Sequence, residues 1–132
     1  MKLAHIAISV SHINRSLVFY GKHFGFRLKK KYPHKGPGLT IAILRKNDIT
    51  LELFEFSKHA LLPKYRRTLE SDLHTIGTKH FSFALKDITG AYRKFKKAGV
   101  PFACDMRVFD NGARYFFIRD PDGILVEIME EG

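Results

Sequence analysis

The fold is decided by His5-Ile6-Ala7-Ile8-Ser9-Val10-Ser11-His12-Ile13, because the chain repeats this pattern as His80-Phe81-Ser82-Phe83-Ala84-Leu85-Lys86-Asp87-Ile88. The two segments begin 75 residues apart, and in both of them apolar residues recur at every second position. Alternation of this kind is typical of a half-buried β-strand. A repeated strand predicts that the chain holds two copies of one structural unit.

The same separation relates a second pair of predicted strands. Residues 49–53 fall on residues 124–128 without a gap, and the turns before them, 46–48 and 121–123, also coincide. These turns contain Asn, Asp and Gly, which tolerate the positive φ angles that tight hairpins need. We therefore expect each of these strands to follow a hairpin turn.

An amphipathic helix is predicted after the first strand of each copy. In the first copy the helix has Asn14 or Ser16 as its N-cap and ends at Gly25. In the second copy it begins near Asp87 and stops at Gly99. Both helices carry apolar residues at helical spacing, so we expect both to face a core.

Three extended stretches follow each helix, which makes each copy a β-α-β-β-β module. The predicted strands are 26–32, 39–44 and 49–56 in the first copy, and 102–108, 114–118 and 124–129 in the second. The modules cover about 1–57 and 78–132, and a connector, 58–77, joins them through one weak helix within 61–73. The sequence therefore predicts the α+β class, with residues 1–132 as a single domain of two modules. One module leaves an apolar sheet face open, so two modules should pair, within a chain or across a dimer.

Composition narrows the kind of protein further. The chain has 132 residues, of which 45% are hydrophobic and 27% charged, as in an ordinary globular domain. A single cysteine, Cys104, excludes an internal disulfide and favours a reducing compartment. We find no signal-peptide pattern and no apolar run of membrane-spanning length, so a cytoplasmic location without membrane contact is expected.

The net charge of +10 falls in short clusters rather than in a long basic tail. One of these clusters lies near the end of the second predicted helix, where cations stabilise the helix dipole. A solvated face is therefore favoured over a nucleic-acid surface, although the charge would also attract small anionic substrates.

Four polar residues occupy matched positions in otherwise apolar strands: His5, Glu52, His80 and Glu127. In each copy the glutamate follows the histidine by 47 residues. Taken alone, each would be a hydrogen-bonded structural histidine or a solvent-facing glutamate. Their repetition favours a single divalent cation, since two imidazoles and two carboxylates suit Zn²⁺, Ni²⁺, Co²⁺ or Fe²⁺. Strand alternation places Glu55 and Glu130 on the opposite face, which we expect to be solvent-exposed.

These features together resemble the vicinal oxygen chelate superfamily, and in particular glyoxalase I and its relatives. Besides the four matched residues, the resemblance rests on Ser16-Leu17-Val18-Phe19-Tyr20 leading to Phe24-Gly25-Phe26, and on the hairpin Asp120-Pro121-Asp122-Gly123. It implies two tandem modules that form a curved mixed-sheet cup around one metal ion held by the four matched residues. It also implies a homodimer with shared sites, although some relatives close the cup within one chain.

Glyoxalase I isomerises the adduct of a small oxoaldehyde and a thiol through an enediolate, so the resemblance implies a metal-dependent lyase or isomerase with a small-molecule substrate. Glu127 is the first choice for the catalytic base and Glu52 the second. Ser9 stands where glyoxalase I usually has an arginine that holds glutathione, which leaves the thiol carrier open. An acyl-CoA-type epimerase and a non-catalytic small-ligand or nucleic-acid-binding module are the alternatives. The candidate contacts for an anionic tail of the substrate are Arg107, Asn111 and Arg114. The alternative is that these three are exposed loop residues with no role in binding.

Overall fold

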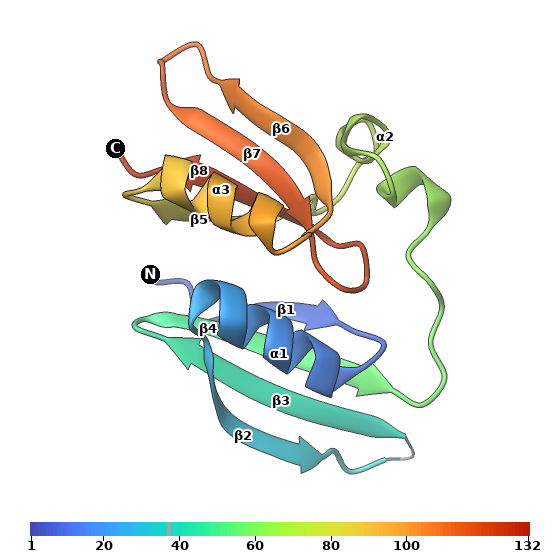
Figure 1. Cartoon of the computed structure of the whole chain (residues 1–132). Coiled ribbons are helices and arrows are strands. Elements are labelled where there is room, and N and C mark those ends of the chain that lie inside the picture. Colours follow the sequence, from blue (N-terminus) through green and yellow to red (C-terminus); the bar gives the residue numbers. More distant parts are fainter. Residues whose placement is uncertain (37) are drawn as a thin grey trace. The chain divides into compact units, whose positions relative to one another are not determined.

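The computed structural model describes residues 1–36 and 38–132. The chain divides into two compact units, Met1–Leu61 and Leu62–Gly132. Each unit contains a four-stranded mixed sheet with one helix between the first two of its strands (Figure 1). The predicted β-α-β-β-β order is therefore present in both copies, and the predicted α+β class is confirmed.

The sheet of the first unit has the strand order β1-β4-β3-β2. β1 runs parallel to β4, whereas β3 is antiparallel to both of its neighbours. The parallel pairing of the first and last strands sets Ile6, the first residue of β1, opposite Leu51 near the start of β4. The elements are β1 (Ile6–Ser9), α1 (Ile13–Phe24), β2 (Arg27–Pro33), β3 (Leu39–Lys46) and β4 (Ile49–Phe56).

One end of α1 is determined by a residue next to it in the sequence, and the other by a residue of a distant strand. Gly25 adopts a φ of 76° at the C-cap, where a left-handed residue ends the helix as predicted. The prediction of Asn14 or Ser16 as the N-cap is wrong, because the cap residue is His12 and its side chain makes no capping bond. Instead, Glu55 on β4 accepts a hydrogen bond from the backbone N–H of Ile13. A strand carboxylate thus replaces the local cap.

The core of the first unit lies between α1 and one face of the sheet. Tyr20 of α1 and Leu44, Leu51 and Leu53 of the strands are almost fully buried. Burial of one such leucine contributes about 1.5–3 kcal/mol. Because side chains alternate along a strand, the residues between these leucines lie on the other face of the sheet, which α1 does not cover.

The second unit repeats this arrangement with the strand order β5-β8-β7-β6. Asp87 caps its helix by accepting a hydrogen bond from the N–H of Gly90, as its sequence position predicts. Phe95 of this helix and Phe116 of the sheet are buried with their ring centroids 6.0 Å apart. The elements are β5 (Phe81–Leu85), α3 (Ile88–Lys97), β6 (Phe102–Val108), β7 (Arg114–Arg119) and β8 (Leu125–Glu130).

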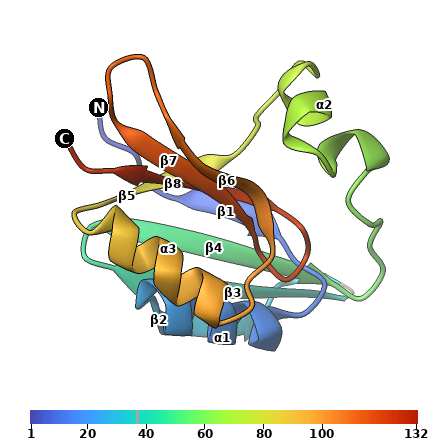
Figure 2. The same cartoon turned by 45° about the horizontal axis from the view of Figure 1, so that its top comes forward.

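The connector forms two short pieces rather than the single helix expected within 61–73. These are the 3₁₀-helix η1 (Lys64–Arg66) and the helix α2 (Leu69–Leu73), and Figure 2 shows α2 on the path toward β5. Thr68 separates them, because it takes an extended conformation and caps α2 by accepting a bond from the N–H of Ser71. Both pieces belong to the second unit, where Leu69 packs against a cluster of Cys104, Phe117 and Leu125.

Candidate functional site

In the first unit, His5 and Glu52 meet on the sheet face that α1 does not cover. The parallel pairing sets Ala7 opposite Glu52, and His5 precedes Ala7 by two positions, so all three side chains share that face. The Nε2 atom of His5 lies 3.4 Å from Oε2 of Glu52. The His5 side chain is 49% exposed and that of Glu52 19%.

The second unit repeats the pair with His80 and Glu127. Ser82 pairs with Glu127, and His80 precedes Ser82 by two positions. Nε2 of His80 lies 3.5 Å from Oε2 of Glu127, and the two side chains are 22% and 11% exposed. Each module thus joins the imidazole and the carboxylate that the sequence singled out.

His80 is held in a partly apolar setting. Its ring stands edge-on to Phe117 at a centroid separation of 4.8 Å, and Phe117 pairs directly with Glu127 across β7 and β8. The Nδ1 atom of His80 is buried and has no hydrogen-bond partner among the described residues. Buried polar atoms are nearly always satisfied, so this nitrogen is free to bond to a further group.

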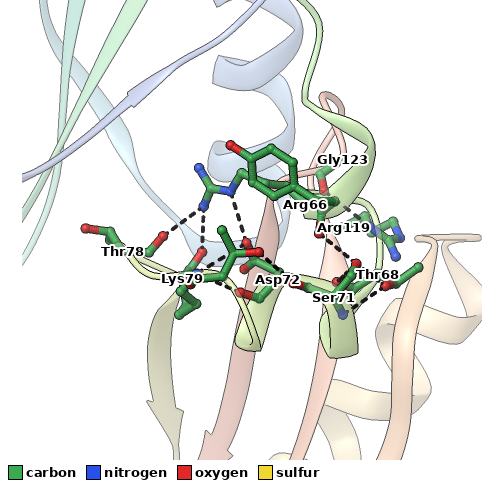
Figure 3. Close-up of polar contacts among 10 residues, drawn as sticks. Arg66, Thr68, Ser71, Asp72, Thr78, Lys79, Arg119 and Gly123 are labelled. Carbon is green, nitrogen blue, oxygen red and sulfur yellow. Dashed lines mark hydrogen bonds and ion pairs between the residues drawn. The ribbon is translucent and has the colours of Figure 1, made fainter.

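A network in the connector fixes the chain just before His80 (Figure 3). Asp72 of α2 is 1% exposed, and its Oδ1 atom lies 3.1 Å from Nε of Arg66 and 3.8 Å from Nζ of Lys79. Arg66 also donates to the carbonyl oxygens of Thr78 at 3.1 Å and Lys79 at 2.9 Å. The network therefore anchors the two residues that precede His80. No sequence pattern predicts this network, because a lone aspartate in a short polar segment is typical of a solvent-facing residue.

Glu55 and Glu130 lie on the opposite face from the paired glutamates, as expected, but the prediction that they point to solvent is wrong. Glu55 accepts the bond from Ile13 at the start of α1. Glu130 accepts from Nε and Nη2 of Arg114 at 3.0 and 2.5 Å. The side-chain hydrogen bond from Arg114 lowers the pKa of Glu130 and raises that of the guanidinium. Both glutamates are therefore structural.

The three candidate substrate residues lie in different settings. Arg107 is exposed and pairs with Tyr115, which places it on the same face as Glu127. Asn111 accepts a bond from the N–H of Ala113 within the β6–β7 turn. Arg114 is bound by Glu130 and by Thr89 of α3, on the face away from Glu127. Their substrate roles stay predictions, and this geometry favours Arg107 among them.

The four matched residues form two pairs, one in each unit, and the four-ligand set stays a prediction. Among residues 1–36 and 38–132, no group of three or more His, Cys, Asp or Glu side chains comes together. Each pair nevertheless offers a nitrogen and a carboxylate oxygen, and the second ring nitrogen of His80 has no partner in the part of the chain that the structure describes. This donor chemistry fits a borderline divalent cation. None of the helices in the described part of the chain is long and apolar enough to cross a membrane.

Comparison with known proteins defines the class. Residues 2–128 match the Glyoxalase/Bleomycin resistance protein/Dioxygenase superfamily, and the chain belongs to it. It is 29% identical to the Uncharacterized protein YwbC of Bacillus subtilis (strain 168), over 98% of this chain and 97% of that protein.

Solved structures agree on the fold. The glyoxalase family protein of Enterococcus faecalis matches with a TM-score of 0.83 and 23% identity, over 98% of this chain and 97% of that one. The trypanothione-dependent glyoxalase I of Leishmania major matches with a TM-score of 0.74 and 20% identity, over 99% and 87%. The expected vicinal oxygen chelate fold, with its curved mixed sheets, is therefore confirmed.

Proposed function

We propose that this protein is a metal-dependent enzyme of glyoxalase I type, which isomerises the adduct of a small oxoaldehyde and a thiol. The observation that supports this proposal is the repeated His–Glu pair, at 3.4 Å in one module and 3.5 Å in the other. Membership of the superfamily agrees with small-molecule chemistry. A purely structural role for both pairs would not require the same residues at the same strand positions twice.

His5, Glu52, His80 and Glu127 would hold one divalent ion, of Zn, Ni, Co or Fe. When bound, such an ion supplies electrophilic stabilisation of negative charge that develops on substrate oxygens. Ligands from both modules are needed to complete the set. We propose a homodimer in which His5 and Glu52 of one chain work with His80 and Glu127 of the other, and closure within one chain is the alternative.

The reaction needs a base that takes a proton from one carbon and returns it to its neighbour. Glu127 suits this role best, because its side chain is 11% exposed and lies beside Phe117, whereas Glu52 is 19% exposed. Exclusion of water keeps a transferred proton from exchanging with solvent before it returns. Glu52 is the second choice, and Arg107 on the same face as Glu127 would contact the substrate.

Metal analysis of the purified chain tests the ligand assignment. We expect one bound divalent ion per pair of modules in the wild type, and a loss of most of it in His5→Ala and in His80→Ala. His59→Ala is the matched control, because His59 is exposed and its Nδ1 atom lies 3.1 Å from the backbone carbonyl oxygen of Phe56 rather than beside a carboxylate. Equal metal content in all four proteins would contradict the assignment.

A substrate panel tests the activity itself. Oxoaldehyde adducts of several thiols should give thioester absorbance in the presence of metal. Acyl thioesters should show proton exchange into deuterated solvent only if the chain is an epimerase. Tight ligand binding without either reaction would support a non-catalytic module instead.

A further inference from the structure

A strongly basic hollow lies in the first unit, where the end of α1, the start of β2 and the β3–β4 hairpin come together. It has a volume of about 480 Å³ and is lined by Gly25, Arg27, Lys29, Arg45, Lys46 and Asn47. No acidic side chain is among these residues. Its volume falls within the range of about 300–1,000 Å³ that is typical of small-molecule sites.

The charge of the hollow is not compensated within the described part of the chain. Arg27, Lys29, Arg45 and Lys46 have no ion pair or side-chain hydrogen bond there. Arg27 and Arg45 are direct partners across β2 and β3. Like charges in directly opposite positions destabilise a sheet. Strand pairing therefore sets two exposed arginines directly opposite each other, and a bound anion would relieve the repulsion between their charges.

The repeat supplies an internal control for this arrangement. Arg45 pairs with Thr50 and Arg119 pairs with Leu125, and each of these partners precedes the site glutamate of its module by two positions. In the second unit, Arg119 donates to the carbonyl oxygens of Arg67 and Gly123. The described residues offer Arg45 no such acceptor, so the same strand position is hydrogen-bonded in the second module and not in the described part of the first.

Of the four cations that line the hollow, the dipole of α1 offers a stabilising interaction to Lys46. Lys46 lies beside the end of the helix, since a Cβ atom built on Gly25 would be 4.0 Å from its Nζ atom. Cations near a helix C-terminus are stabilised by its partial negative charge. Arg27 and Arg45 are held by strand pairing instead, and nothing described in the protein neutralises them.

The hollow adjoins the face that carries Glu52. In the β3–β4 pairing Glu52 is opposite Ile43, and Arg45 is the next residue on the same face. Such diagonal neighbours lie roughly 7–8 Å apart. A ligand that occupies the hollow could therefore extend to the His5 and Glu52 pair.

We propose that this hollow binds the phosphate or diphosphate end of a small-molecule ligand. Guanidinium groups match phosphate oxygens with paired hydrogen bonds, and two of them side by side suit a multiply charged anion. The assignment of this ligand as the substrate, with its reacting end at Glu52, rests on the proposed function. It identifies the substrate class as a phosphorylated compound or a thiol carrier that bears phosphates.

Calorimetric titration of the full chain with inorganic pyrophosphate, without added metal, tests the binding site. We expect saturable binding that weakens at least tenfold in Arg27→Ala/Arg45→Ala. The matched control is Arg93→Ala/Lys97→Ala, which removes two exposed cations from α3 and should change the affinity less than twofold. Absence of binding to the wild type, or equal weakening in both double variants, would overturn the proposal.

Thermal unfolding distinguishes a loss of pyrophosphate binding from a loss of folded protein in the double variant. Without pyrophosphate, Arg27→Ala/Arg45→Ala should unfold at the wild-type temperature or above it, because the substitution removes a repulsion. Pyrophosphate should raise the midpoint of the wild type and of the control but not that of this variant. If the double variant does not fold, Arg45→Gln carries the test, with an affinity loss of at least threefold expected and an unchanged affinity overturning the proposal.

Two further measurements separate the possible ligands and the two proposals. A single-stranded oligonucleotide that binds more tightly than pyrophosphate at equal phosphate concentration, and loses this affinity in Arg27→Ala/Arg45→Ala, would overturn the small-molecule assignment.

Glu52→Gln should keep its pyrophosphate affinity, so a failure of the proposed catalysis leaves the binding result intact. In the substrate panel, Arg45→Gln should raise KM for phosphorylated substrates only. Equal KM changes for substrates without phosphate would overturn the substrate assignment alone.

Discussion

The two modules carry the same His–Glu pair in unequal surroundings. The His80 side chain is 22% exposed and its ring stands against Phe117, whereas the His5 side chain is 49% exposed. Opposite Glu127 lies Phe117, and opposite Glu52 lies the smaller Ile43. Duplication therefore preserved the donor atoms but not their environments, and this difference supports the proposal of Glu127 rather than Glu52 as the base.

The connector accounts for much of this difference, because it contacts the second module. Leu69 covers the cluster beside Phe117, and Asp72 with Arg66 fixes the approach to His80. It also supplies the carbonyl oxygen of Arg67 that binds Arg119. Among the described residues of Met1–Leu61 no helical segment follows β4 to supply Arg45 with such an acceptor, and Arg45 lines the basic hollow.

The largest expected effect distinguishes the two glutamates. Glu127→Gln is nearly isosteric but cannot accept a proton at neutral pH, so turnover should fall by roughly 10² to 10⁴, the range of lost general-base catalysis. Glu52→Gln should cost less. Steady-state kinetics of both variants, loaded to equal metal content, measures the difference. The reverse order would assign the base to Glu52, and near wild-type rates for both would mean that neither glutamate is the base.

A smaller effect should follow from removal of the buried charge in the connector. Asp72→Asn leaves Arg66 and Lys79 without their carboxylate, which costs about 3–5 kcal/mol for a fully buried pair. Arg66 is 34% exposed and Lys79 21%, so we expect a loss of roughly 2–3 kcal/mol in the free energy of unfolding. Urea denaturation measures it, and Glu70→Gln, which alters an exposed carboxylate of the same helix, is the control. Equal stability of the two variants would show that the network does not hold the connector.

The smallest effect concerns the pH dependence of the second module. Arg114 lowers the pKa of Glu130, so the unfolded state binds the proton more tightly than the folded state. The stabilisation is complete above the unfolded pKa near 4.5 and is lost as the pH falls through the lower folded value. Glu130→Gln should therefore flatten the decline of the urea midpoint between about pH 5 and pH 3, relative to Asp110→Asn as control. An unchanged slope would contradict this assignment.

Local patterns explain which parts of the fold could be predicted. The repeated strands, the hairpin before Ile49, the Asp87 cap and the left-handed Gly25 were all found from short-range rules. The N-cap of α1 was missed because its hydrogen-bond acceptor, Glu55, is 42 residues away in the sequence. The sequence predicts one connector helix because a weak apolar periodicity continues across Thr68. In the structure Thr68 is extended and caps a separate helix, α2.

By itself, the sequence determined the duplicated modules and the four residues that form the two pairs, because strand alternation and a repeat depend only on the order of residues. Only the tertiary structure decided that His80 is shielded, that Glu55 and Glu130 are structural, and that the Arg119 side chain is bound while that of Arg45 has no acceptor among the described residues. These properties depend on segments that are distant in the chain, such as Phe117 beside His80 and Arg67 beside Arg119. The physical reason is that burial and hydrogen bonding are set by the neighbours that folding brings together, and no local pattern specifies them.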